Sequence, residues 1–227
     1  MDQILKIIHP EGWRFFGIFL GITLLCSLFS NVLLLIGSVL CLWCLYFFRD
    51  PIRVTPSNND LVISPADGRV VDIKKVIAPK ELDLGNDEVY RISIFLNVFN
   101  VHVNRSPIGG VIKRIVYFPG RFFNASLDKA SEHNERNALV IETPNEQKIG
   151  VVQIAGLIAR RIVTFSSESD NIRAGERFGL IRFGSRVDVY LPKGVIPLVL
   201  KDQTMIAGES VLANIKGEQI EMTGSCE

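Results

Sequence analysis

The feature that most constrains this chain is a long apolar run near its N-terminus. No charged residue occurs from Phe15 to Phe48, a stretch of 34 residues, whereas one helix needs only about 20 to cross a bilayer. The run is too long for the apolar core of a signal peptide, and no small-residue cleavage site accompanies it. It predicts an N-terminal membrane anchor, residues 1–52, rather than a buried helix of a soluble domain.

The charges that flank the run bear on the form of the anchor. Lys6 and Arg14 precede it, and Arg49 and Arg53 follow it. Cations on both sides favour a helical hairpin that turns near residues 30–31 and keeps both ends in the cytoplasm. One long tilted helix also fits. With arms of only about 16 residues, a shallow re-entrant or interfacial hairpin is a third alternative.

After residue 50 the composition changes, and residues 51–59 (PIRVTPSNN) are typical of a linker. Short apolar or alternating runs between turn signals then predict strands; they lie at 61–63, 70–76, 88–95, 110–118, 138–142, 148–154, 180–183, 186–191 and 211–215. Helical pattern is scarce: residues 127–134 suggest a short helix, and 155–164 are ambiguous. Residues 53–227 are therefore expected to form a mainly β domain, a barrel or a sandwich with few helices.

Composition excludes several functions. The chain has 25 basic and 24 acidic residues, so it lacks the excess of positive charge that is typical of proteins that bind nucleic acid. Its four cysteines have neither zinc-site spacing nor the pattern of a disulfide framework, and indicate a reducing compartment. The common dinucleotide, nucleotide-triphosphate, zinc-protease and serine-hydrolase motifs are absent.

Two polar residues stand where buried strands end. His102 ends an apolar strand ahead of a Pro-Gly-Gly turn, and Asp67 occupies the turn of SPADG. Either could serve a site, or could be a structural histidine and a turn aspartate. His133 lies among polar residues and is more typical of a solvated or capping side chain.

Six short motifs follow one another along the chain: FFRDP at 47–51, SPADG at 64–68, FNVHVNRSP at 99–107, PGRFFN at 119–124, NERN at 134–137 and FGS at 183–185. None is specific alone. In this order they resemble the phosphatidylserine decarboxylase family, in particular its short bacterial form.

That resemblance gives a meaning to Gly184-Ser185, a flexible pair at the start of a strand that otherwise suggests only a bulge or bend. In this family the protein cuts its own Gly-Ser bond, and the serine becomes a pyruvoyl group. The Ser185 hydroxyl would attack the Gly184 carbonyl, which glycine leaves open on both faces. The products would be a large chain, 1–184, and a small chain, 185–227.

The resemblance also implies the reaction. The pyruvoyl of Ser185 would form a Schiff base with phosphatidylserine and accept electrons as CO2 leaves, giving phosphatidylethanolamine without metal or pyridoxal phosphate. His102 would be the general acid and Asp67 the base or orienting carboxylate of self-cleavage. The two chains would stay together as a heterodimer at the cytoplasmic face of a bacterial inner membrane, in contact with membrane lipid. A homo-oligomer and an ether-lipid substrate remain open.

One position departs from part of the family. Longer relatives carry a second histidine three residues after the first, where this chain has Arg105. Asp67 could then act directly or through water, His133 could substitute, or strain at Gly184 could contribute more.

A second class of function uses the same β pattern. SPADGRVVDI and QTMIAGESVLANI are Gly-punctuated segments like those of lipoyl or biotinyl carrier and adaptor domains. A carrier needs a lysine at a hairpin tip, however, and Lys129 lies in a helix-like stretch.

Overall fold

The computed structural model of the chain describes residues 7–120, 134–156, 161–182, 185–217, 219 and 221–224. Packing divides the chain into two units. One consists of Met1–Ile52 with Phe99–Val101, and the other of Arg53–Val98 with His102–Glu227.

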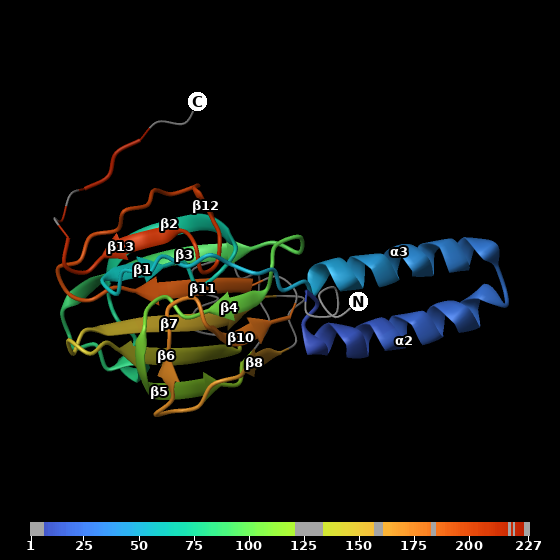
Figure 1. The fold of residues 1–227 in the computed structure, drawn as a ribbon, viewed down its shortest axis with the longest axis horizontal. Helices are drawn as coiled ribbons and strands as arrows, with labels where there is room; N and C mark the ends of the chain where they lie inside the picture. Colours follow the sequence, from blue (N-terminus) through green and yellow to red (C-terminus); the bar gives the residue numbers. More distant parts are fainter. Residues whose placement is uncertain are drawn as a thin grey trace. The chain divides into compact units, whose positions relative to one another are not determined.

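The first unit is a pair of antiparallel helices, α2 (Pro10–Ser27) and α3 (Asn31–Phe47), which lie side by side (Figure 1). Each has a side-chain cap at its N-terminus: the His9 ring accepts from the Glu11 N–H, and the Ser30 hydroxyl accepts from the Val32 N–H. The helices approach closely where Gly37 of α3 faces Thr23 of α2, because any larger residue at 37 would collide with Thr23.

The apolar run thus forms two helices with a turn between them and not one long helix. Among the residues that the structure describes, no helix has both the length and the hydropathy of one that crosses a membrane.

The second unit is built from three antiparallel sheets (Figure 1). The largest has eight strands in the order β12-β2-β3-β11-β7-β6-β5-β9, the next has the order β4-β10-β8, and β1 pairs with β13. The strands are β1 Leu61–Ile63, β2 Gly68–Ile77, β3 Glu88–Leu96, β4 Val103–Arg105, β5 Gly110–Phe118, β6 Arg136–Glu142, β7 Lys148–Ala155, β8 Ile162–Thr164, β9 Asn171–Ile172, β10 Arg177–Ile181, β11 Ser185–Tyr190, β12 Thr204–Met205 and β13 Val211–Asn214. The prediction of a mainly β domain is confirmed.

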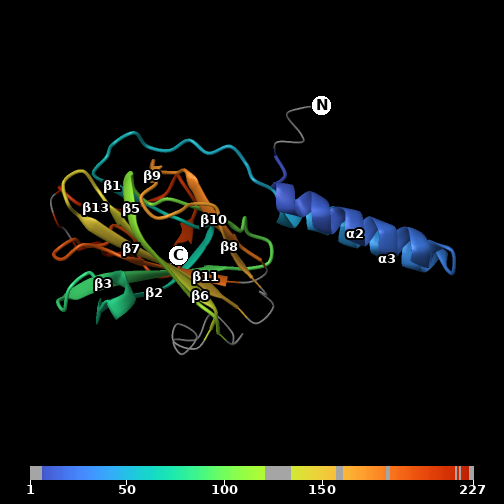
Figure 2. The ribbon, with the colours of Figure 1, turned by 90° about the horizontal axis from the view of Figure 1, so that it is seen from below.

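The main core lies on one side of the large sheet, where β8 and β10 pack over β7 (Figure 2). Apolar side chains that point to this side, among them Ile94, Leu96 and Val187, are fully buried. A second apolar cluster lies on the other side, where Leu82 of the short 3-10 helix Lys80–Leu82 packs with Val152 and other residues. The central strands are therefore covered on both sides.

Because both sides of the large sheet are covered, the prediction of a half-exposed strand at 186–191 is wrong. Alternating polar and apolar residues predict a strand with one side in solvent, yet all six residues of β11 are buried. The prediction failed because Arg186 and Asp188, on the side expected to be exposed, form an ion pair with each other at 2.9 Å (Arg186 Nε to Asp188 Oδ1). Pairing makes burial of the two charges tolerable.

All nine predicted strands are present, with ends that differ by a few residues. The four that the sequence did not predict, β4, β8, β9 and β12, have only two or three residues each, too few for a period to show. The helix predicted at 127–134 lies almost entirely outside the described residues.

Candidate active site

Ser185 is the first residue of β11, the strand between β3 and β7 in the large sheet. It pairs in regular register with Leu96 on one side and Ala155 on the other, so no bulge is present at Ser185 itself. Its side chain is fully buried, and its hydroxyl has no hydrogen-bond partner in the described part of the chain. A buried hydroxyl without a partner costs about 1–3 kcal/mol, so the position is not explained by stability.

His102 immediately precedes β4 and is fully buried. Its carbonyl accepts a 3.2 Å hydrogen bond from the Ile181 N–H, which extends the β4–β10 ladder by one residue. Ile181 lies only four residues before Ser185 in the chain. The backbone of His102 is therefore hydrogen-bonded to a residue that lies only a few positions before Ser185 in the sequence.

Asp67 lies in the turn between β1 and β2, and its carboxylate is held by three hydrogen bonds. Arg53 Nη2 donates to Oδ1 at 2.9 Å and to Oδ2 at 2.8 Å, and the Ala207 N–H donates to Oδ1 at 2.8 Å. Glycine is needed next in the chain, because a side chain at Gly68 would collide with the Phe95 carbonyl. The Asp67-Gly68 pair therefore determines both the position of the carboxylate and the residue at which β2 begins.

Strand register places Ser185 and the start of β2, which follows Asp67, at the same end of the large sheet. β3 lies between β2 and β11, and Arg69 pairs with Phe95 while Ser185 pairs with Leu96. The start of β2 is therefore two strand spacings, about 10 Å, from Ser185. Asp67 lies in the turn just before β2, and His102 lies just before β4 of the smaller sheet.

A buried amide network ties the two sheets together beside Ser185. Gln153 of β7 donates from Nε2 to Asn104 Oδ1 at 2.8 Å and accepts at Oε1 from Asn137 Nδ2 at 3.0 Å. Asn104 Nδ2 in turn donates to the Pro65 carbonyl at 3.4 Å. The network therefore joins three of the quoted motifs, those that contain Pro65, Asn104 and Asn137.

The network lies on the Ser185 side of the sheet. Ser185 pairs with Ala155, and Gln153 is two residues from Ala155 on β7, so alternation places Ser185 and Gln153 on the same side. The same alternation on β4 places His102 on the side of Asn104. Gly179 of β10 makes room for the Gln153 side chain, because a Cβ atom at position 179 would lie 2.9 Å from Gln153 Nε2.

Arg105, which the resemblance aligns with a second histidine of longer relatives, is buried and donates from Nη1 to the Gly175 carbonyl at 3.0 Å. The side chain that binds Asp67 is Arg53, from the stretch expected to be a linker. Sequence reasoning missed Arg53, because nothing in PIRVTP indicates that this arginine contacts a residue fourteen positions later.

The opposite side of β11 carries a second polar cluster. The buried Arg186–Asp188 pair lies near Tyr190 and near Arg91, which also binds Asp72 at 2.7 Å. Burial, and then the Asp188 carboxylate, raises the pKa of Tyr190, so its phenol stays protonated. These charges are already paired and face away from Ser185, which fits a structural role.

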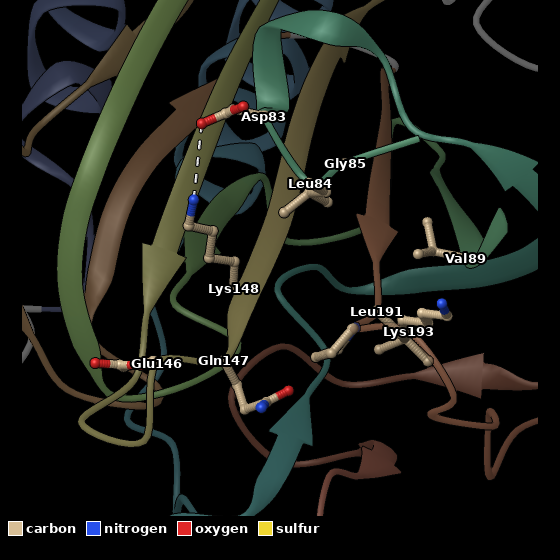
Figure 3. A pocket seen from close by; sticks show the side chains of 10 residues that line it. Asp83, Leu84, Gly85, Val89, Glu146, Gln147, Lys148, Leu191 and Lys193 are labelled. Carbon is tan, nitrogen blue, oxygen red and sulfur yellow. Dashed lines mark ion pairs between the residues drawn. The ribbon is translucent and has the colours of Figure 1, made fainter. Parts of the chain in front are cut away.

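One pocket of about 300 Å³ lies at the far end of β11, where Leu191 follows the strand (Figure 3). Its charged side chains include Lys148, 3.7 Å from Asp83, and Lys193, which is bound to Asp87. The length of β11, Ser185–Tyr190, separates the pocket from Ser185, so the pocket is distinct from the candidate site.

Some predicted positions lie outside the described residues: Gly184, His133 and Lys129. Among the residues that are described, no three His, Cys, Asp or Glu side chains group as they would around a metal ion.

The amide network can be tested by Gln153→Leu, which keeps the side-chain volume but removes the amide. Asn104 Oδ1 and Asn137 Nδ2 each lose a partner, so the free energy of unfolding should fall by about 1–3 kcal/mol for each group. Urea unfolding of the full chain measures this loss. Gln147→Leu, at an exposed glutamine just before β7, is the control and should change stability by less than about 0.5 kcal/mol. Equal losses in the two variants would refute a special role for Gln153.

Comparison with known proteins adds a family to this geometry. The family described as phosphatidylserine decarboxylase matches residues 40–213. A relative from Ruegeria pomeroyi is 60% identical over 215 residues, which cover 95% of this chain and 98% of the relative. One from Nitrobacter winogradskyi is 58% identical over 209 residues, 92% of this chain and 85% of the relative. Both are named phosphatidylserine decarboxylase proenzyme. The chain belongs to the phosphatidylserine decarboxylase family.

Proposed function

We propose that this chain is the proenzyme of a decarboxylase that converts phosphatidylserine to phosphatidylethanolamine and CO2, with a pyruvoyl group made from Ser185. The names of its relatives support the reaction. The observation that carries the proposal is the Ser185 hydroxyl, buried and without a partner in the described residues, at the first position of a central strand. Family membership displaces the adaptor interpretation.

The position fits a group formed in place. The backbone of Ser185 is held on both sides by β3 and β7, so its new end would stay fixed after the bond before it is cut. Alternation along the strands places its side chain on the side of the large sheet that also carries Gln153. A preceding glycine tolerates the strained backbone that such an attack requires.

Self-cleavage needs no other reactant than water. The Ser185 oxygen bonds to the Gly184 carbonyl carbon while the Gly184–Ser185 C–N bond breaks, so the amide becomes an ester and Ser185 gains a free amine. Elimination across the Ser185 Cα–Cβ bond then releases the Gly184 carboxylate. Water replaces the nitrogen, which leaves as ammonia. Asp67 accepts the hydroxyl proton of Ser185, directly or through water.

In the mature enzyme, Ser185 would carry the pyruvoyl group, which would supply an electrophilic ketone for the lipid amine and an acceptor for the electrons released with CO2. His102 provides the proton that replaces CO2 on the lipid. Its burial keeps bulk water from competing for that transfer. An ether-linked lipid with the same headgroup presents the same reacting atoms.

The two products remain one assembly. Residues 185–227 contribute β11, β12 and β13, which pair with β3 and β7, with β2 and with β1. Every one of these partners belongs to residues 1–184, so the large and small chains form a heterodimer through the sheets themselves.

The helical hairpin is the membrane anchor in this proposal, and it enters the bilayer from the cytoplasmic face of a bacterial inner membrane. Large apolar side chains cover its outside, and those at the turn are the most exposed: Leu28 is 79% and Phe29 81% accessible. Its arginines, Arg14 and Arg49, lie at the other end of the helices. A hairpin that is apolar at its tip and cationic at its base suits insertion from one side, with both ends remaining there.

Ser185→Ala should abolish self-cleavage, because no hydroxyl remains to attack Gly184. Intact mass spectrometry should find one chain of 227 residues, whereas the unchanged protein should give residues 1–184 and a small chain blocked at its N-terminus. Ser93→Ala is a matched control, since Ser93 is also buried on the large sheet and its hydroxyl has no partner among the residues that the structure describes, and it should be cut normally. A cut at any other bond contradicts the assignment.

His102→Ala and Asp67→Ala should fail at different stages. The His102 variant should mature but decarboxylate phosphatidylserine about 10²–10⁴-fold more slowly, the usual loss for a general acid. The Asp67 variant should accumulate as uncut chain. A gel of each purified variant and CO2 release per mature chain measure the two steps. Uncut His102→Ala would mean that His102 serves both steps and that this division of roles is wrong.

Charges at the hairpin tip should release the full chain from membranes. Leu28→Glu combined with Phe29→Glu should abolish flotation with vesicles of phosphatidylcholine and phosphatidylglycerol, because a buried charge costs about 2.5–3.5 kcal/mol in a bilayer. Ile77→Glu, at an exposed apolar residue of the β unit (64% accessible), should float like the unchanged protein. Flotation of the double variant would refute the anchor.

A further inference from the structure

The stretch expected to be a linker is fastened to the β unit. Residues 51–58 form no helix or strand, yet three successive residues have separate attachments. Arg53 binds Asp67, the Val54 N–H donates to Glu209 Oε1 at 3.2 Å, and Thr55 lies against Gly175, where no side chain fills the space. The attachments come from three different loops, so residues 53–55, the docked segment, have a fixed course.

The Arg53–Asp67 pair is the strongest of these attachments. One guanidinium nitrogen bonds both carboxylate oxygens, at 2.9 and 2.8 Å. Both side chains are largely buried, at 12% and 14% accessible. Less water surrounds such a pair than a surface ion pair, so its attraction is less screened.

The contacts of Asp67 define what it can still do. A carboxylate has about four acceptor positions; Oδ1 accepts from Arg53 and Ala207, and Oδ2 from Arg53. Oδ2 thus keeps capacity for one further donor. Arg53 and the Ala207 N–H fix the direction of that remaining position.

We propose that Arg53 is a positioning residue for self-cleavage: it holds the Asp67 carboxylate at the end of the sheet where β11 begins. The inference rests on the proposed function, in which Asp67 assists the attack of Ser185. Arg105, which by resemblance replaces the second histidine of longer relatives, is bound to Gly175. The arginine that orients Asp67 is instead Arg53 of the docked segment.

The test follows the rate of self-cleavage in full-length chains made by cell-free translation and separated on denaturing gels. Arg53→Gln should slow cleavage about 10- to 100-fold, the scale of a misplaced reacting group, and Arg53→Lys should restore part of the rate. Arg69→Gln is the matched control. Arg69 is also paired to an aspartate, Asp202, but that pair is exposed, and its loss should leave the rate unchanged.

Chemical rescue separates positioning from a general contribution to folding. Guanidinium ion at millimolar concentration should speed cleavage of Arg53→Ala, because it can occupy the space beside Asp67, whereas sodium chloride at equal ionic strength should not. Cleavage of Arg53→Gln at the normal rate overturns the inference. Slow cleavage of Arg53→Ala that guanidinium does not relieve also overturns it, since Arg53 would then serve the fold.

The unchanged protein tells the two proposals apart. If it is not cut between Gly184 and Ser185, the proposed function itself fails. If it is cut and the Arg53 variants behave like Arg69→Gln, only the role of Arg53 fails.

Discussion

Everything at the candidate site depends on how β11 is held. Each of its six residues pairs with β3 on one side and with β7 on the other, and apolar clusters cover both sides of the sheet. A residue at the start of such a strand cannot shift without breaking hydrogen bonds to two neighbours. Ser185 is therefore positioned by the backbone, before any side chain contributes. Reactive groups benefit from this kind of support, because small errors in position are costly.

Polar side chains on both sides of the sheet add specificity rather than much net stability. Gln153 links the two sheets through neutral amides, and Arg186 pairs with Asp188 on the other side. A typical hydrogen bond contributes about 1 kcal/mol net, and a buried ion pair often contributes nothing beyond what apolar packing would give. These contacts fix the register of the strands, because a shift of one residue along β7 or β11 would leave the polar groups without partners.

Much of this molecule was predictable from sequence, and the failures have definite causes. The apolar run predicts the helical pair, and alternating segments predict the longer strands, because both depend on local periodicity. Motif order singled out Gly184-Ser185, Asp67 and His102, and strand register places Ser185 and the start of β2, which follows Asp67, at one end of the large sheet. Arg53 and Gln153 were missed, since their roles come from contacts between segments far apart in the chain. Burial of Arg186 was missed because alternation reports the period of a strand and not what covers its second side.

The way β11, β12 and β13 are inserted among β1, β2, β3 and β7 has a consequence for the lifetime of the mature protein. Before the cut, the chain refolds as one molecule, and its recovery does not depend on concentration. After the proposed cut before Ser185, refolding would require two fragments to associate, and the strands of the small fragment would have few partners within that fragment. Unfolding of the mature protein therefore becomes difficult to reverse at low concentration. Its persistence would then be set by how slowly the sheets open, so that activation also ends the chain's ability to repair itself.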